Sequence, residues 1–211
     1  MTIRRGTNWG QQIARPVDLV TCQDDVEASM LITDNLLKSL ELPTIAIRNS
    51  NLARVLGIDG AKFAPDMTTN VFSTLFDLIR VDCLTVKNTA VTVFGLGYAL
   101  LRNSWWRGEI IAVLNESFIG DLDCAPRAHP NDGKLDVVIV SSEMKLSQRL
   151  RASRRARSGT HIPHPNITIA QKTYFEAAIG TPKMLVVDGR QISAVKACKF
   201  TVIPDAVNLC W

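Results

Sequence analysis

From about Phe63 onward, short apolar or alternating runs follow one another with turn residues between them, and this pattern restricts the fold more than any other. Each run has the length of a β-strand, and Gly, Pro, Asn and Asp separate the runs. Such a succession of strands predicts a mostly antiparallel β-sandwich or barrel-like sheet. The runs occupy residues 75–81, 90–94, 110–114, 135–140, 167–170, 184–187 and 200–203.

The first part of the chain alternates between strand-like and helix-like segments. Residues 17–20 and 44–47 read as short apolar strands, and residues 24–40 carry apolar side chains at near-helical spacing. We therefore predict an α+β protein. A small, truncated α/β fragment at residues 1–62 precedes a β-sandwich domain at residues 63–211.

One helix is expected among the later strands, at residues 143–158, where Gly and Pro are absent and Gly159 supplies a C-cap. At about 100° per residue, Leu146 and Leu150 mark its packed face. Its basic residues form either a solvated surface or a surface for an anionic phospholipid or a phosphate-bearing ligand. The candidate ligand residues that share one face of the helix are Arg151, Arg154 and Arg155.

Composition and charge limit the class of protein. The 211 residues are 46% hydrophobic and 21% charged, and no run of about 18 apolar residues occurs, so we expect a soluble protein. The N-terminus lacks the layout of a secretory signal, which makes the cytoplasm the default, with peripheral contact at the inner membrane surface as an addition. The net charge of +4 is mild, so no nucleic-acid partner is expected.

Five cysteines lie far apart, and none forms a Cys-x-x-Cys pair. This spacing argues against both a disulfide framework and a zinc knuckle.

Two acidic turns precede or follow strand-like runs. In the turn Asn131-Asp132-Gly133, a carboxylate beside a glycine allows side-chain and main-chain oxygens to converge on a hard cation, or it forms a plain Asx turn. In the turn Asp188-Gly189, the pair suits a tight hairpin. Alternatively, Asp188 accepts a proton from a substrate hydroxyl while Arg190 holds an anionic group.

Two residue pairs leave alternatives open. Trp105 and Trp106 form either a lipid-facing rim or a core tryptophan beside an exposed one. His161 and His164 have a spacing found in some metal sites, but the neighbouring prolines favour an extended loop with structural histidines.

Several segments, taken in order, resemble the diacylglycerol kinase-like lipid kinases, which are relatives of the sphingosine kinases and, in their nucleotide domain, of NAD kinases. The resemblance covers about residues 108–211 and implies the second domain of that family, a β-sandwich that closes over the lipid headgroup. The matching segments are 110–115, Gly120, 125–128, 131–137, 159–161, 187–189 and 202–207.

Upstream, residues 45–58 resemble the family's Gly-Thr-Gly-Asn-Asp-x-Ala-Arg-x-Leu-Gly segment, and residues 22–26 stand where the family has its Gly-Gly-Asp-Gly-Thr phosphate loop. Side chains on Gln23 and Asp25 would block the close approach of phosphate, and Asp25 would repel it. The resemblance implies that the nucleotide-contacting positions are Asp24, Asn49, Ser50 and Asn51.

The resemblance also assigns roles in the second domain. Asp188 stands at the position of the general base, and Arg190 replaces an acidic partner. Asn131 replaces the first acid of the family's cation turn, so the remaining candidate ligands of a structural Mg²⁺ are Asp132 and the carbonyl of Leu135, together with Asn131. Asn115, in the first matching segment, is a further candidate ligand residue.

Phosphoryl transfer from ATP to a lipid hydroxyl needs phosphate positioning, Mg²⁺ and a base near the acceptor, and only the base position is plainly preserved. We therefore expect a lipid kinase-family protein whose activity is reduced or lost and whose cleft still takes a lipid or other anionic ligand. The alternatives are an active kinase, alone or with a partner chain, and a structural or oligomerisation module. A truncated α/β fragment exposes sheet edge or core, which favours a homo-oligomer.

Overall fold

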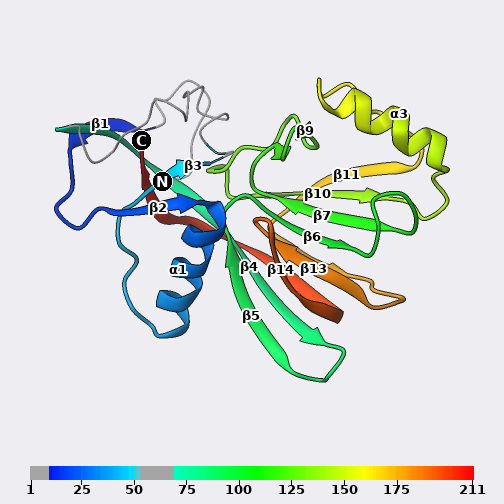
Figure 1. Cartoon of the computed structure of the whole chain (residues 1–211), viewed down its shortest axis with the longest axis horizontal. Helices are drawn as coiled ribbons and strands as arrows, with labels where there is room; N and C mark the ends of the chain where they lie inside the picture. The colour runs from blue at the N-terminus through cyan, green and yellow to red at the C-terminus, as the bar shows by residue number, and fades with distance from the viewer. Residues whose placement is uncertain (1–9, 51, 53–68) are drawn as a thin grey trace.

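The computed structural model describes residues 10–50, 52 and 69–211, and most of its strands join into one continuous sheet (Figure 1). Neighbouring strands are antiparallel except where β3 lies parallel to β2 and to the end of β14. The predicted α+β class, with a mostly antiparallel sandwich after a small α/β fragment, is confirmed. The N-terminal elements are β1 (Gln11–Ala14), β2 (Val20–Asp24), α1 (Asp25–Leu37) and β3 (Ile45–Asn49).

Two layers of the sheet face each other and enclose the main core. One layer runs in the order β13-β6-β7-β10-β11, and the other pairs β5, β4, β14 and β12. Because both faces of the first layer are covered, the side chains of β7 are buried throughout: Ile111 and Val113 face the sandwich core, whereas Ile110, Ala112 and Leu114 face the loops and helix outside. The remaining elements are β4 (Asn70–Thr85), β5 (Ala90–Gly95), β6 (Tyr98–Arg102), β7 (Ile110–Leu114), β8 (Phe118–Ile119), β9 (Leu122–Asp123), β10 (Leu135–Val140), α3 (Leu146–Ala156), β11 (Ile167–Lys172), β12 (Tyr174–Ala177), β13 (Lys183–Val187) and β14 (Arg190–Cys210).

Two long strands, β4 and β14, belong to both parts of the molecule. They pair from Val195 to Cys210 of β14, and the register shifts between Ile203 and Val207. Beyond that shift, the end of β14 pairs with β3 and closes a second core, which contains Ile32, Phe76 and Trp211. The predicted division between residues 62 and 63 lies outside the described residues.

The predicted strand at residues 17–20 is wrong except for its last residue. Pro16 begins a turn in which the N–H of Leu19 faces the carbonyl of Pro16, and Val17 is fully exposed. The strand β2 therefore begins only at Val20, whose N–H bonds to the carbonyl of Thr44.

The helix α3 is shorter than predicted, and its predicted packed face is wrong. Leu146 and Leu150 are 55% and 40% exposed, whereas Arg149 and Ala156 are buried, with only 5% of each exposed. The helix therefore packs through a basic residue and small residues, not through its leucines. The N–H of Thr160 donates to the carbonyl of Arg155 around Gly159, so the predicted glycine C-cap is confirmed.

Arg149 explains this inversion because its guanidinium binds main-chain carbonyls beneath the helix. Its Nε donates to Met144 at 3.0 Å, and its Nη atoms donate to Trp105, Gly108 and Ser141. These bonds join α3 to the 105–108 loop and to the end of β10, and they satisfy a charge that burial would otherwise make costly.

We expect Arg149→Met to lower the free energy of unfolding by about 3 kcal/mol, because it removes charge-assisted bonds and leaves buried carbonyls without donors. Arg151→Met, two residues further along on the exposed side of the helix, should change stability by less than about 0.5 kcal/mol. Urea unfolding followed by tryptophan fluorescence compares the two variants. Equal stability of both would contradict the clamp assigned to Arg149.

Candidate functional site

Asp188 lies at the tip of the β13–β14 hairpin, in a tight turn with positive φ at both central residues: 45° at Asp188 and 88° at Gly189. This geometry confirms the predicted Asp-Gly hairpin, since such turns require left-handed backbone at both positions. The side chain does not point into solvent. Asp188 is 5% exposed, and its carboxylate accepts N–H bonds from Leu96, Gly97 and Tyr98 at 2.6, 2.9 and 2.8 Å.

The segment that holds this carboxylate, between β5 and β6, passes close to a second buried acid. Glu116 is 1% exposed, and a Cβ at Gly97 would collide with its carboxylate. A side chain at position 97 would therefore force the carboxylate of Glu116 to move. A Cβ at Gly97 would also lie 3.4 Å from the carboxylate of Asp188, so both acids approach this backbone segment closely.

The electrostatic environment of Asp188 disfavours its charged form. Burial raises the pKa of Asp188 to about 7, the three N–H bonds oppose this shift, and nearby Asp25 adds to it. The same acids act on Tyr98, whose pKa is raised to about 12 by burial and then by Asp188, Glu116 and Asp25. The site is thus a partly enclosed, acidic junction.

The N-terminus of α1 is occupied by its own carboxylates. Asp24 is the N-cap and accepts the N–H of Glu27 at 2.9 Å, while the Glu27 carboxylate accepts the N–H of Gln23 at 2.6 Å. Burial, followed by Glu27 and Asp24, raises the pKa of Cys22 to about 11. Helix N-termini bind phosphate through such N–H groups, and here side-chain acids take them.

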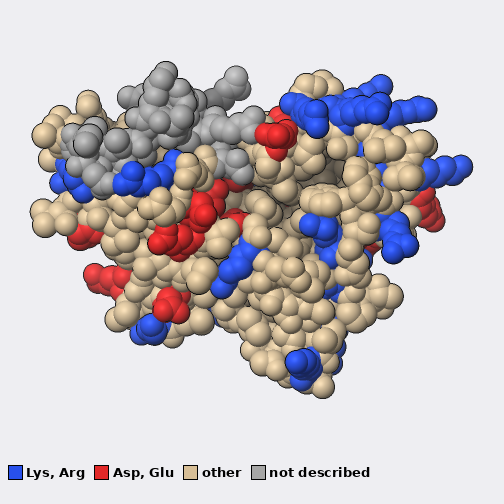
Figure 2. Space-filling model, viewed as in Figure 1, with Lys and Arg blue, Asp and Glu red and all other residues tan. Residues whose placement is uncertain are grey.

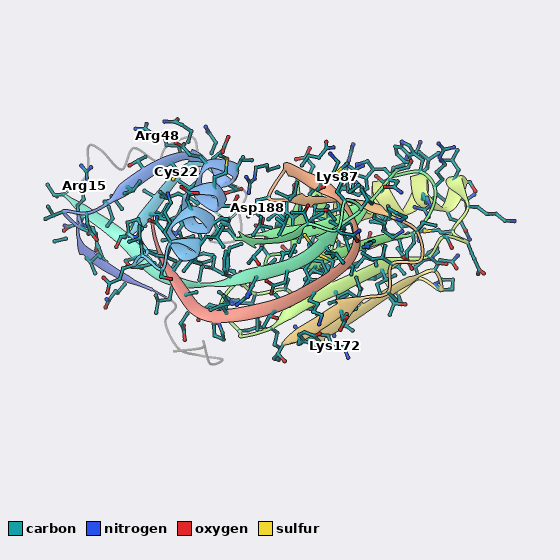
Figure 3. All side chains as sticks on the ribbon, turned by 90° about the horizontal axis from the view of Figure 1, so that it is seen from below. Arg15, Cys22, Arg48, Lys87, Lys172 and Asp188 are labelled. Atoms are coloured by element: carbon teal, nitrogen blue, oxygen red, sulfur yellow. The ribbon has the colours of Figure 1, made fainter. Side chains whose placement is uncertain are left out.

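Segments far apart in the sequence meet at this junction, where Cys22, Arg48 and Asp188 are marked in Figure 3. The hydroxyl of Ser50 donates to the carboxylate of Asp25, and Asn49 is the register partner of Asp24. A Cβ at Gly189 would lie 3.6 Å from Val26 of α1. The structure therefore brings Asp24, Asn49 and Ser50 to the side of Asp188, while Asn51 lies outside the described residues.

Asn115 and Arg190 flank the junction in different ways. Asn115 is buried, and its amide donates to the carbonyls of Asp77 at 2.8 Å and Leu96 at 2.9 Å, so it supports the segment that holds Asp188. Arg190 follows the hairpin turn directly. Within the described part of the chain, its buried Nε has no hydrogen-bond partner.

The predicted cation turn makes several hydrogen bonds within the protein. Asn131 donates to the carbonyl of Leu75 and to the carboxylate of Asp205, and Asp132 accepts the N–H of Lys134 at 3.0 Å. The neighbouring carboxylate of Asp77 accepts N–H groups of Gly133 and Asp205 at 2.7 and 2.9 Å.

Among residues 10–50, 52 and 69–211, no group of three or more His, Cys, Asp or Glu side chains is arranged to hold a metal. Leu135, whose carbonyl is the third predicted ligand, begins β10. Mg²⁺ prefers several converging oxygens, and a cation held by Asn131, Asp132 and the carbonyl of Leu135 stays a prediction.

A cavity of about 290 Å³ lies beneath α3, on the outer face of β6, β7 and β10. Strand β6 carries residues both at the acidic junction and at this cavity. Tyr98 bonds to Asp188, and Leu100, two residues later on the same face of the strand, lines the cavity. Its lining is predominantly apolar and comprises Leu100, Trp105, Trp106, Ile110, Ala112, Ile119, Leu122, Cys124, Val138, Val140, Met144, Arg149, Ala152, Ser153, Ala156, His161 and Ile167.

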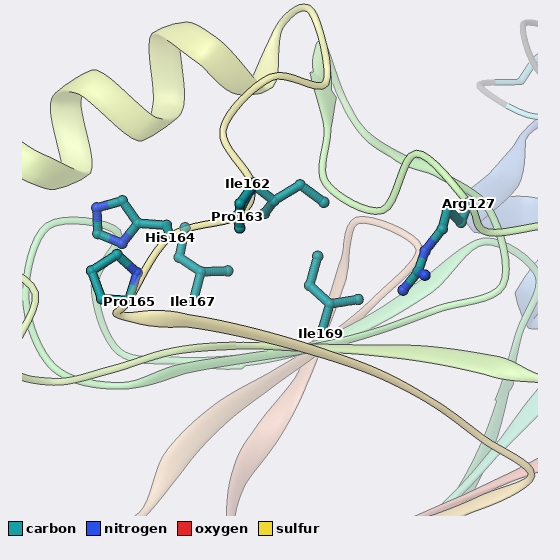
Figure 4. A pocket seen from close by; sticks show the side chains of 7 residues that line it. All are labelled: Arg127, Ile162, Pro163, His164, Pro165, Ile167 and Ile169. Atoms are coloured by element: carbon teal, nitrogen blue, oxygen red, sulfur yellow. The ribbon is translucent and has the colours of Figure 1, made fainter.

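A second, more open groove of about 780 Å³ lies beside β11 (Figure 4). Arg127 approaches it from one side and His164 from the other, with Ile167 and Ile169 between them. His161 and His164 therefore line different hollows. Burial lowers the pKa of His161, so this ring is neutral near pH 7.

The candidate ligand residues Arg151, Arg154 and Arg155 lie on the exposed side of α3, away from Asp188. The sequence did not predict Tyr98 or Glu116 as site residues, nor the buried guanidinium of Arg149 beneath α3. Glu116 follows Asn115 directly, and Tyr98 follows a Gly-Leu-Gly run, but neither signal is specific without the fold.

No described helix is long and apolar enough to cross a bilayer.

Comparisons with known proteins agree with this architecture. Two solved structures from Bacillus anthracis str. Sterne, a putative diacylglycerol kinase and a diacylglycerol kinase, superpose with TM-scores of 0.62 and 0.59 at 14% and 15% identity. Each superposition covers 93% of this chain and 78% or 77% of the other. At these identities the likeness shows a shared fold. No curated protein sequence matches the chain.

The sequence profile of the YegS C-terminal NAD kinase beta sandwich-like domain matches residues 79–211. These residues include the whole sandwich from the second half of β4, with the Asp188 hairpin and the cavity beneath α3. The resemblance seen in the sequence is thereby confirmed. The chain belongs to the family of the YegS C-terminal NAD kinase beta sandwich-like domain.

Proposed function

We propose that this protein binds a lipid in the cavity beneath α3 and that its ATP-dependent phosphorylation of a lipid hydroxyl is reduced or lost. One observation supports the proposal: the chain has an apolar cavity, and carboxylates occupy the N-terminus of α1, where the related kinases bind phosphate. The first feature suits an acyl chain. The second disfavours nucleotide phosphates.

The cavity supports a lipid through its size and lining. Its volume of about 290 Å³ is just below the range for ligand pockets, about 300–1,000 Å³, so it suits one apolar chain more than a bulky ring system. Tyr98, whose N–H bonds to Asp188, lies two residues before the cavity residue Leu100 on β6. An elongated molecule would thus place its apolar part near Leu100 and its polar head at the acidic junction.

The proposal of weak or absent kinase activity rests on charge at the start of α1. Asp24 and Glu27 take N–H groups that a phosphate would need, and Asp25 lies beside them. Figure 2 shows acidic side chains gathered near the junction of β2 and α1. A polyphosphate placed there would meet repulsion where the family's glycine loop offers only donors.

We expect no saturable heat when the protein is titrated with ATP and Mg²⁺ to millimolar concentrations in a calorimeter, because carboxylates occupy the phosphate position. Asp24→Ser with Glu27→Gln keeps groups that cap the helix and removes two negative charges, so it provides the informative comparison. Saturable binding to the unaltered protein would contradict the proposed loss of nucleotide binding.

We expect Ala152→Phe to weaken binding of a fluorescent fatty acid by about tenfold or more, because the new ring fills space that an acyl chain would take. Leu150→Phe is the matched control, since it adds a ring to the exposed side of the same helix. Fluorescence titration in vesicle-free solution measures both affinities. Equal binding by the two variants would exclude the cavity as the lipid site.

A second candidate function, an active lipid kinase, is favoured by Asp188 alone. A buried carboxyl whose pKa is about 7 has the basicity that a general base needs near neutral pH. Arg190 beside it fits the binding of an anionic group more directly than proton abstraction. The binding function is therefore the first proposal and phosphoryl transfer is the second.

If the protein phosphorylates diacylglycerol, we expect the rate to rise with pH through about 7 and to vanish in Asp188→Asn. The pKa of Asp188 is higher in the folded state than its ordinary value, so its contribution to stability is present at low pH and is lost as pH rises through about 7. Asp188→Asn should reduce that slope in pH-dependent urea unfolding. A rate profile unchanged in Asp188→Asn would remove Asp188 as the base.

A further inference from the structure

The outer side of α3 combines exposed leucines with arginines. We define the α3 face as Leu146, Leu150, Arg151, Arg154 and Arg155 together with Trp106, which belongs to the adjoining loop. Leu146, Leu150 and Trp106 are 55%, 40% and 50% exposed. Figure 2 shows basic side chains gathered along the edge of the molecule that α3 forms.

The positive charge of this face has no local compensation. No acid lies within α3, and among the residues that the structure describes, no Asp or Glu forms an ion pair with Arg151, Arg154 or Arg155. Like charges three and four positions apart on a helix repel each other. The face is therefore suited to an anionic surface that neutralises several charges together.

The leucines distinguish between kinds of anionic partner. A solvated helix gains nothing by exposing Leu146 and Leu150, and a nucleic-acid surface needs cations but no large apolar side chains. A helix that presents basic and apolar side chains on one exposed side is typical of segments that lie in a membrane interface. Trp106 adds an amphipathic ring of the kind enriched at that depth.

The helix and the tryptophan loop are held as one unit. Arg149 donates to the carbonyls of Trp105 and Gly108 from the inner side of α3, so the loop that carries Trp106 is tied to the helix. Arg102 lies 4.3 Å above the ring of Trp105, which fixes the other side of the loop. The exposed residues thus form a preorganised surface.

We propose that the α3 face docks on a bilayer that contains anionic phospholipid. Ala152 and Ala156 line the cavity from the inner side of the same helix, and Trp106 lies at both the face and the cavity. Docking therefore brings the cavity to the source of its ligand, and this consequence rests on the proposed function. The docking itself requires neither nucleotide nor an occupied cavity.

The test is sedimentation of the full chain with sucrose-loaded vesicles, without nucleotide or diacylglycerol. We expect binding to phosphatidylcholine vesicles that contain phosphatidylglycerol, weak binding to phosphatidylcholine alone, and a decrease as salt is added. Replacing the three arginines of the face by Ala should weaken partitioning on the order of 100-fold. Replacing Leu146 and Leu150 by Ser should weaken it on the order of tenfold or more.

The matched control removes the same charge from other surfaces of the molecule. Lys87, Lys172 and Lys196 are exposed and lie outside α3, and their triple replacement by Ala should leave partitioning close to that of the unaltered protein. An equal loss in this control, or no loss in the arginine variant, overturns the proposal. So does binding to neutral vesicles as tight as to anionic ones.

Two further measurements separate this proposal from its alternatives. If the arginine variant loses affinity for duplex DNA but not for vesicles, the face serves a nucleic acid and the membrane proposal is wrong. Fatty-acid binding by Ala152→Phe in vesicle-free solution reports on the cavity alone. Loss of vesicle binding with intact cavity binding, or the reverse, therefore shows which of the two proposals fails.

Discussion

The ladder between β4 and β14 is the constraint on which the rest of the structure depends. Both strands are long, and they pair through the sandwich core and onward into the N-terminal α/β unit. The change of direction occurs at the register shift before Val207, where Asp205 has φ of 51° and its N–H bonds to Asp77. A β-bulge of this kind bends and twists a strand, which lets β14 leave one core and enter the other. The acidic junction lies where this ladder joins the two units.

This arrangement explains why backbone, not other side chains, holds Asp188. The β5–β6 connection approaches both Asp188 and Glu116 closely at Gly97, and the N–H groups of Leu96, Gly97 and Tyr98 donate to Asp188. Those donors offset the cost of burying a carboxyl near Asp25 and Glu116. The geometry of the junction is therefore set by main-chain hydrogen bonds, and Asn115 reinforces it by donating to the carbonyls of Asp77 and Leu96.

Local patterns predicted what depends on local chemistry. The Asp188-Gly189 hairpin and the Gly159 cap follow from backbone preferences that short motifs carry, and the sandwich follows from strand-length runs between turns. The packed face of α3 could not be found this way, because it depends on carbonyls of Trp105 and Gly108, which approach Arg149 only in the folded chain. Tyr98 and Glu116 were missed for the same reason. The turn at Pro16 was misjudged because three apolar residues outweighed a turn signal.

In the proposed function, charge distinguishes binding from catalysis more than packing does. The cavity beneath α3 is bounded by apolar side chains whose contacts are independent of what stands at the start of α1. At the N-terminus of α1, in contrast, the carboxylates of Asp24 and Glu27 accept the N–H groups that a phosphate would need, and Arg190 places a cation beside Asp188. Charges act over several ångströms within a partly buried junction, so a few side chains suffice to invert its preference. A lipid with an anionic head could meet Arg190 while its chain lies near Leu100, whereas a nucleotide phosphate would meet Asp24, Asp25 and Glu27. In the proposed function, lipid binding therefore does not require phosphoryl transfer, because the two activities would use residues from different ends of the junction.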